Sequence, residues 1–307
     1  MEKCREIDFV RCVLMAIVIL VHVVNFGELH PLFKQSMFTF FMPAFLIITG
    51  YLVNVSKSLA DFGRYMLRIV LPYVLMVVSF SLLSFFLPVR DGLTELSAAA
   101  VAEKVFVTSV GPYWFLYDMA VCGAAYYAVF RLGRRLSLAS RLALFATLLY
   151  AMALWLPLLT FADATLYFIG ATLRQCGVSF GQVFRPTPFS LFPFLALIFQ
   201  RDLWHRWLCL LLPFFAISFL SWLGGVLPVG IRRAMDYAGR NTLPIYIFHP
   251  IFTLASKYYL PLFSFDSTGI LHALFTIALG FVGSMAIAMG LDKTGMVRVF
   301  GMKRMLR

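Results

Sequence analysis

The stretch FVRCVLMAIVILVHVVNF, from Phe9 to Phe26, is long and apolar enough to cross a lipid bilayer, yet it carries two ionisable side chains, Arg11 and His22. Such groups cost free energy inside a membrane, so each is a candidate functional residue. At about 100° and about 1.5 Å per residue, the spacing puts both on nearly the same side of a helix, roughly 16 Å apart along its axis. We therefore predict that Arg11 and His22 are the two ends of one site.

The composition extends the membrane assignment to the whole chain. Of 307 residues, 62% are apolar and 13% are charged, and the mean hydropathy is +0.88, whereas about 25% of the residues of soluble domains are charged. These values predict an all-α protein, a polytopic bundle of membrane helices without a soluble catalytic domain. The net charge of +12 fits Lys and Arg in cytoplasmic loops and does not indicate nucleic-acid binding.

Apolar runs separated by breaks predict about ten transmembrane helices in a single domain, residues 1–307, of a multi-pass protein of the cell (inner, cytoplasmic) membrane. With both termini in the cytoplasm (N-in/C-in), most of the 26 Lys and Arg residues fall inside, as the positive-inside rule requires. The outer segment 88–111 is expected to hold a short surface helix. The ten predicted helices are 9–26, 36–55, 64–87, 112–131, 139–159, 161–180, 187–200, 206–227, 241–262 and 269–291.

Two arginines mark the cytoplasmic end of the predicted helix 64–87. Arg64 and Arg68 are four residues apart and share one face of that helix. Their spacing fits a topology anchor, and it also fits a phosphate-binding edge, because the planar guanidinium binds phosphate with two parallel hydrogen bonds. Both interpretations remain open at this point.

The sequence GPYWFLYDM opens the predicted helix 112–131 on the outer side. Tyr113 and Trp114 are typical of the aromatic belt at a membrane interface. Asp118 lies more than a turn further in, within an apolar segment, and an isolated acid inside a membrane is a functional candidate.

A second histidine lies in GRNTLPIYIFHP, Gly239 to Pro250. Tyr246 and His249 are three residues apart and share a face of the predicted helix. For His22 there are two readings. It is either a functional group or a neutral imidazole bonded to a neighbouring helix, with Asn25 placed to orient one ring nitrogen.

Arg11 taken alone also fits a positive-inside anchor that pairs with Asp8. Two other patterns do not indicate chemistry. GVSFG, Gly177 to Gly181, matches a nucleophile motif but lacks the preceding strand that the motif needs. No histidine pairs with cysteine or carboxylate at metal-ligand spacing, so we expect no metal and no tightly bound cofactor.

Taken in order, several motifs resemble the acyltransferase-3 family of integral-membrane O-acyltransferases over nearly the whole chain. They are R-x10-H (Arg11, His22), MPAFLIITG (Met42 to Gly50), an arginine pair before Pro72, YWFL (Tyr113 to Leu116) and NTLPIYIFHP (Asn241 to Pro250). The sequence departs from the family in having R-x-x-x-R, with Tyr65 where the common R-x-x-R would place an arginine.

The resemblance implies transfer of an acyl group, usually acetyl, from a cytoplasmic thioester donor to a hydroxyl of a sugar or another acceptor at the outer face. It implies that His22 is the essential histidine with Arg11 as its partner, and that Arg64 and Arg68 help to hold the donor. Acetyl-CoA or another acyl-CoA would then be a co-substrate, and polysaccharide modification an expected outcome.

A mechanism follows as a hypothesis. His22 acts as the base for the acceptor hydroxyl or carries the acyl group itself, and Arg11 and Arg68 bind the phosphates of coenzyme A. In this mechanism, the carbohydrate acceptor would meet Tyr113, Trp114 and Asp118, with His249 and Tyr246 lining the same cavity.

The alternatives to an acyltransferase are a transporter or flippase for a sugar-linked or small-molecule substrate and a non-catalytic scaffold.

Overall fold

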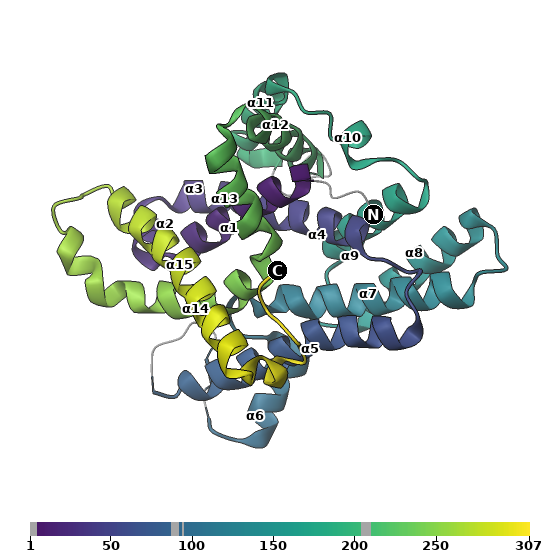
Figure 1. The fold of residues 1–307 in the computed structure, drawn as a ribbon, viewed down its shortest axis with the longest axis horizontal. Coiled ribbons are helices and arrows are strands. Elements are labelled where there is room, and N and C mark those ends of the chain that lie inside the picture. The colour runs from purple at the N-terminus through teal and green to yellow at the C-terminus, as the bar shows by residue number, and fades with distance from the viewer. Residues whose placement is uncertain (1–4, 87–91, 94, 204–209) are drawn as a thin grey trace. The chain divides into compact units, whose positions relative to one another are not determined.

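The computed structural model describes residues 5–86, 92–93, 95–203 and 210–307 (Figure 1). Within these ranges all regular secondary structure is helical, which confirms the all-α prediction. Four helical segments are long and apolar enough to cross a membrane, and a fifth joins them if two helices bent by 51° are counted as one span. The ten spans and the N-in/C-in topology stay predictions. The four segments are Pro31–Leu52, Leu59–Leu83, Leu138–Trp155 and Ile270–Thr294, and the bent pair is Ala98–Thr108 with Gly111–Leu132.

Eight of the predicted runs each overlap one main helix, which extends beyond its run by up to five residues, at the start of the run 64–87. Residue 87 of the run 64–87 and residues 206–209 of the run 206–227 lie outside the described ranges. A short helix, α6 (Ala98–Glu103), lies in 88–111, as expected for that segment. The main helices are α5 (Leu59–Leu83), α7 (Trp114–Leu132), α8 (Leu138–Trp155), α9 (Phe161–Gln175), α11 (Leu191–Ile198), α12 (Leu212–Val226), α14 (Thr242–Tyr259) and α15 (Ile270–Thr294). Shorter helical segments are α10 (Phe180–Val183), η1 (Lys104–Thr108), η2 (Gly111–Tyr113), η3 (Pro188–Ser190), η4 (Arg201–Leu203), η6 (Leu260–Phe263) and η7 (Met296–Phe300).

The first predicted run is interrupted. Helix α1 (Arg5–His22) ends at the histidine, and α2 (Val24–Leu29) begins after Val23, whose backbone is extended with φ −75° and ψ 104°. The prediction of one helix over 9–26 was therefore wrong at this point. His22 lies at the carboxyl end of a helix instead of within one.

The second predicted run is divided as well, into α3 (Pro31–Phe38) and α4 (Phe41–Leu52). Pro43 accounts for the division. It has no N–H to donate to the Thr39 carbonyl, and its ring would clash with that carbonyl in a continuous helix.

One helix was not predicted at all. Helix α13 (Val229–Arg240) lies in a segment that the sequence assigned to a cytoplasmic loop. It is amphipathic and carries Arg232, Arg233 and Arg240, so it gives no signal in a search for long apolar runs. It nevertheless packs directly against α1.

The chain divides into two compact units. The first comprises Met1–Phe45, Val178–Lys293 and Arg304–Arg307. Within it, α1 packs against α12, α13 and α14 (Figure 1). The contact with α13 is close, because a Cβ atom added to Gly239 would lie 1.7 Å from the Asp8 carbonyl oxygen.

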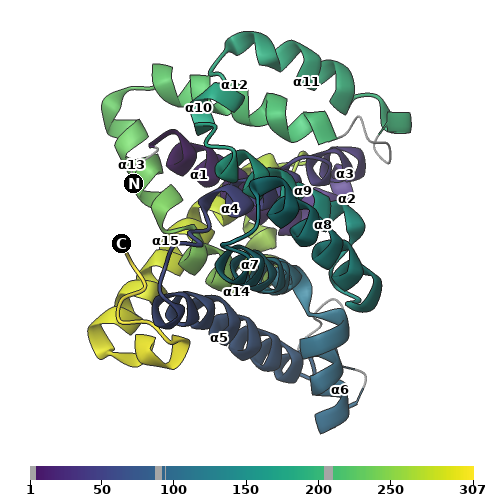
Figure 2. The ribbon, with the colours of Figure 1, turned by 90° about the vertical axis from the view of Figure 1, so that its right-hand side faces the viewer.

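The second unit comprises Leu46–Gly177 and Thr294–Lys303. Helices α5 and α7 run side by side in it, as both views show (Figures 1 and 2). Backbones also touch between α4 and α9. A Cβ added to Gly50 would lie 2.3 Å from the Tyr167 carbonyl oxygen, and one added to Gly170 would lie 2.0 Å from that of Ile47. Small residues allow such close approach between membrane helices.

We expect Gly170→Ala to destabilise the protein, because its methyl group would overlap the Ile47 carbonyl oxygen and force α4 and α9 apart. Overpacking of this kind typically costs about 1–3 kcal/mol. Gly63→Ala in α5 is the matched control, since no atom lies within 4 Å of its added Cβ and alanine favours helix formation. Melting curves of both variants in detergent test the contact, and equal melting temperatures would contradict it.

Candidate active site

His22 is the last residue of α1 and is half-buried. Its Nδ1 lies 2.6 Å from the carbonyl oxygen of Val18, one turn earlier in the same helix. A carbonyl oxygen only accepts hydrogen bonds, so Nδ1–H is the donor. In the neutral ring the proton is therefore on Nδ1 and the lone pair is on Nε2, the form that a general base requires.

His249 of α14 lies against His22. The two ring centroids are 5.5 Å apart and the rings meet edge to face at 68°. His249 is fully buried, and its Nδ1 donates to the Tyr246 carbonyl oxygen at 2.8 Å. Its Nε2 is buried and has no hydrogen-bond partner among the described residues. The rings of Tyr246 and His249 are also in contact, with centroids 5.8 Å apart. The structure thus brings together three of the predicted site residues.

Asn25 lies beyond the break at Val23, in α2. Its side chain faces the loop before α15, where an added Cβ at Gly269 would be 3.1 Å from its Nδ2. The ring of His22 is oriented by the Val18 carbonyl. The sequence had assigned that orienting role to Asn25.

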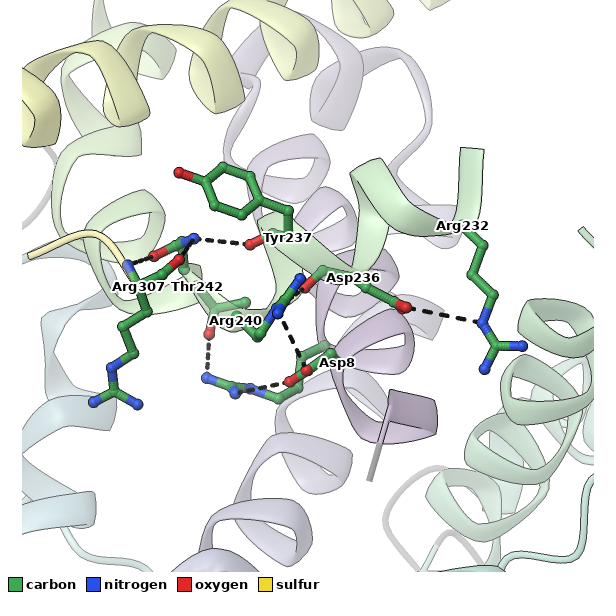
Figure 3. Close-up of polar contacts among 9 residues, drawn as sticks. Asp8, Arg232, Asp236, Tyr237, Arg240, Thr242 and Arg307 are labelled. Atoms are coloured by element: carbon green, nitrogen blue, oxygen red, sulfur yellow. Dashed lines mark hydrogen bonds and ion pairs between the residues drawn. The ribbon is translucent and has the colours of Figure 1, made fainter. Parts of the chain in front are cut away.

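Arg11 belongs to a cluster of charges at the other end of α1, in which Figure 3 labels Asp8, Arg240 and Thr242. Its guanidinium donates to the Thr242 hydroxyl at the start of α14 and lies 3.9 Å from the Asp8 carboxylate, which is the predicted i−3 pair. Arg240 of α13 lies 3.8 Å from the other oxygen of the same carboxylate. Two guanidinium groups thus share one carboxylate, and these three side chains together carry a net charge of one positive unit.

The junction between α13 and α14 holds this cluster in place (Figure 3). The Asn241 side chain donates to the Tyr237 carbonyl at 2.9 Å and accepts from the Arg307 N–H at 2.8 Å. Arg232 and Asp236 pair along α13 at 3.8 Å. Asn241 therefore links α13 to residues 304–307. It does not cap α14 through its side chain.

The predicted arginine pair lies in the second unit, on α5. Arg64 pairs with Asp61 at 2.6 Å, and both side chains are mostly exposed, as in a surface anchor. Arg68, one turn further along, is half-buried. Its Nε is buried and makes no hydrogen bond with any described residue. Arg68 therefore retains donor capacity for an anionic ligand.

The remaining predicted residues also lie in the second unit. Tyr113 is fully buried and packs against Phe80 with centroids 5.5 Å apart, so its ring contacts protein and is not exposed at the surface of the unit. Trp114 is half-buried at the start of α7. Asp118 is fully buried, and both carboxylate oxygens lack a hydrogen-bond partner among the described residues. A buried carboxyl group without partners is costly, which makes Asp118 a candidate to bind a ligand.

The family model described as an acyltransferase domain matches residues 5–289, which is the whole chain apart from residues 1–4 and 290–307. The chain belongs to the acyltransferase-3 family. No curated protein and no solved structure matches it. The R-x10-H, R-x-x-x-R, YWFL and NTLPIYIFHP motifs all fall within the matched range.

Sequence reasoning predicted the pair of Arg11 with Asp8 and missed two other members of this cluster, Thr242 and Arg240. The segment that holds Arg240 was assigned to a cytoplasmic loop, and no partner in another helix was predicted for Thr242. The sequence signal that could have identified them is their position, since Thr242 lies within the NTLPIYIFHP motif and Arg240 directly precedes it.

A groove on the first unit lies apart from these residues. It has a volume of about 380 Å³ and an apolar lining from α1, α13 and α15: Cys12, Val13, Ala16, Ala234, Met235, Ala238 and Phe281. None of the predicted site residues lines it. No group of three or more His, Cys, Asp or Glu side chains suited to a metal ion is found in the described part of the chain.

We expect Asp8→Asn to lower stability by about 1 kcal/mol, because two half-buried guanidinium groups lose the carboxylate that they share. Glu28→Gln is the matched control, since it removes the same charge from an exposed position on α2. Chemical or thermal unfolding of the two variants in detergent measures the difference. Equal losses in both would show that the shared carboxylate contributes nothing.

Proposed function

We propose that this protein is a membrane O-acyltransferase that moves an acyl group, acetyl in the simplest case, from acyl-CoA to a hydroxyl of an extracytoplasmic carbohydrate. Membership of the acyltransferase-3 family supports acyl transfer. The observation that carries the proposal is the state of His22, whose Nδ1–H is held by the Val18 carbonyl. Nε2 is then the nitrogen that receives a proton or an acyl group.

In the base route, Nε2 of His22 takes the proton of the acceptor hydroxyl as the oxygen bonds to the acyl carbon. The carbon–sulfur bond of the thioester breaks, and the proton passes from Nε2 to the leaving thiolate to give the free thiol of coenzyme A. In the covalent route, Nε2 attacks the acyl carbon first, and the acceptor hydroxyl then takes the acyl group from the imidazole. Both routes use the same nitrogen.

For the donor, we propose one arginine in each unit as a phosphate-binding group. Arg11 shares Asp8 with Arg240, so this part of the first unit has an excess of positive charge. Arg68 in the second unit has a buried Nε without a partner among the described residues, and Arg64 next to it is paired with Asp61. Arginine suits the phosphates of coenzyme A because its planar fork donates two parallel hydrogen bonds.

For the acceptor, we propose Asp118 with Tyr113 and Trp114 as the region that receives a sugar, because the Asp118 oxygens are buried and unpartnered within the described chain. We further propose that Tyr246 and His249 contribute from beside His22. The enzyme would act in the inner (cytoplasmic) membrane, with both termini in the cytoplasm and a cell-surface polysaccharide or glycan as acceptor. No tightly bound cofactor is proposed.

The transfer itself can be tested in membranes supplied with labelled acetyl-CoA, by following label into surface carbohydrate. We expect His22→Ala to lower transfer by at least about 100-fold, since a positioned general base is worth about 10²–10⁴. His30→Ala is the matched control, because His30 lies at the end of α2 and bonds to the Thr268 carbonyl. Undiminished transfer in His22→Ala at normal protein levels would overturn the proposal.

The donor site can be tested by the thermal stabilisation that coenzyme A gives to the purified protein, since a ligand that binds only the folded state raises the melting temperature. We expect Arg11→Lys to bind about tenfold more weakly, because a point charge replaces a planar fork. Arg233→Lys, exposed on α13, is the control. Unchanged affinity in Arg11→Lys would remove Arg11 from the donor site, and no response in the wild type would favour a transporter.

A further inference from the structure

The contact between His22 and His249 joins residues 227 positions apart in the sequence. Both rings use Nδ1 in the same way, as a donor to a carbonyl oxygen of their own helix. Each Nδ1 therefore faces its own backbone. In each ring Nε2 lies on the side away from that backbone, as the covalent geometry of imidazole requires.

The Nε2 atom of His249 is an acceptor without a donor. It carries a lone pair because the ring proton is on Nδ1, it is fully buried, and no described residue donates to it. An unsatisfied acceptor in a low-dielectric interior costs free energy. A hydrogen-bond donor placed within reach of this nitrogen would remove that cost.

His22 becomes such a donor during the base route. When its Nε2 takes the proton of the acceptor hydroxyl, the ring is an imidazolium and Nε2 carries an N–H. With the centroids 5.5 Å apart and each ring nitrogen about 1.15 Å from its centroid, the two Nε2 atoms come to about 3.2 Å when both point along the line between the centroids, which is the outer limit of an ordinary hydrogen bond. The lone pair of His249 would then be satisfied only in the protonated state of His22.

We propose that His249 is a positioning residue for the acyl transfer, a neutral hydrogen-bond acceptor that stabilises His22 in its protonated form. The inference rests on the proposed function and deepens it. It assigns His249 a role through His22, in addition to its place beside the acceptor. The N–H that forms on Nε2 of His22 is shared, as a three-centre hydrogen bond, between the acceptor oxygen and Nε2 of His249. Stabilisation that grows as the proton is transferred lowers the barrier of the chemical step, and the proton then leaves from Nε2 of His22 to the thiolate.

Two titratable residues of α14 lie at this site: His249, in ring contact with His22, and Tyr246, in ring contact with His249. Helix α12 contributes no ionisable side chain. Other groups on the elements packed around α1 have other contacts. Arg11, Asp8 and Arg240 form the cluster at the opposite end of α1, Glu28 is exposed on α2, Lys34 lies beside Gly27, and His272 of α15 bonds to the Ser256 carbonyl.

The test measures protonation of His22 without needing transferase activity. Diethyl pyrocarbonate modifies neutral imidazole, so its rate of reaction at His22, followed by peptide mass spectrometry in the purified protein from pH 5 to 8.5, gives a midpoint. We expect His249→Phe to move this midpoint down by about one pH unit, because the acceptor for the protonated ring is lost. His249→Gln, which offers an amide oxygen, should restore most of the shift.

His272→Phe is the matched control, since His272 is equally buried but contacts Tyr259 and Phe263 and not His22. It should leave the His22 midpoint unchanged. His249→Met provides a second apolar variant of different shape in case the Phe variant does not accumulate. An unchanged midpoint in the apolar His249 variants, or an equal shift in His272→Phe, would overturn the proposal.

The labelled-donor assay separates this proposal from the proposed function. In that assay, His249→Phe should lower kcat about tenfold and leave KM for acetyl-CoA unchanged. If the wild type transfers no acyl group but the midpoint still shifts, the proposed function fails and the histidine pair stands. If transfer is normal and the midpoint does not move, the function stands and the role of His249 falls.

Discussion

The packing of α1 against the junction of α13 and α14 is the interaction on which the first unit depends. Gly239 permits backbone contact with Asp8, Thr242 accepts from Arg11, and His249 meets His22. Arg11 precedes His22, and Thr242 precedes His249, so α1 and α14 run in the same direction. Seven residues of α14 rise about 10 Å and eleven of α1 rise about 16 Å, and the long arginine side chain spans most of the difference. The R-x10-H spacing is thus matched to the spacing of Thr242 and His249 on α14.

The sequence predicts individual residues of the site better than their partners. His22, His249 and Asp118 are conspicuous because an ionisable group in an apolar run is costly, whatever surrounds it. The contact between His22 and His249 depends on tertiary packing across most of the chain, which no local pattern encodes. Thr242 was missed for a related reason, since a hydroxyl at the start of a helix already has a local explanation.

The lengths of the apolar runs predict most of the helices. They do not predict the breaks between α1 and α2 and between α3 and α4. Pro43 gives a visible reason for the division between α3 and α4, whereas the break at Val23 carries neither proline nor glycine. Helix α13 was missed because its apolar residues form one stripe of an amphipathic helix. Tyr113 shows a different limit: an aromatic residue at the end of a predicted span is compatible with both an interface and a buried position, and only packing decides between them.

Because of the break at Val23, α1 and α2 also differ in the insertions and deletions that they can accept. An insertion between Arg11 and His22 would rotate the imidazole by about 100° relative to the arginine, so that length is fixed. After Val23 a new hydrogen-bond ladder begins, and α2 and α3 can lengthen, shorten or change composition without turning the histidine. A change of length in α2 or α3 therefore leaves the angular relation between Arg11 and His22 unchanged.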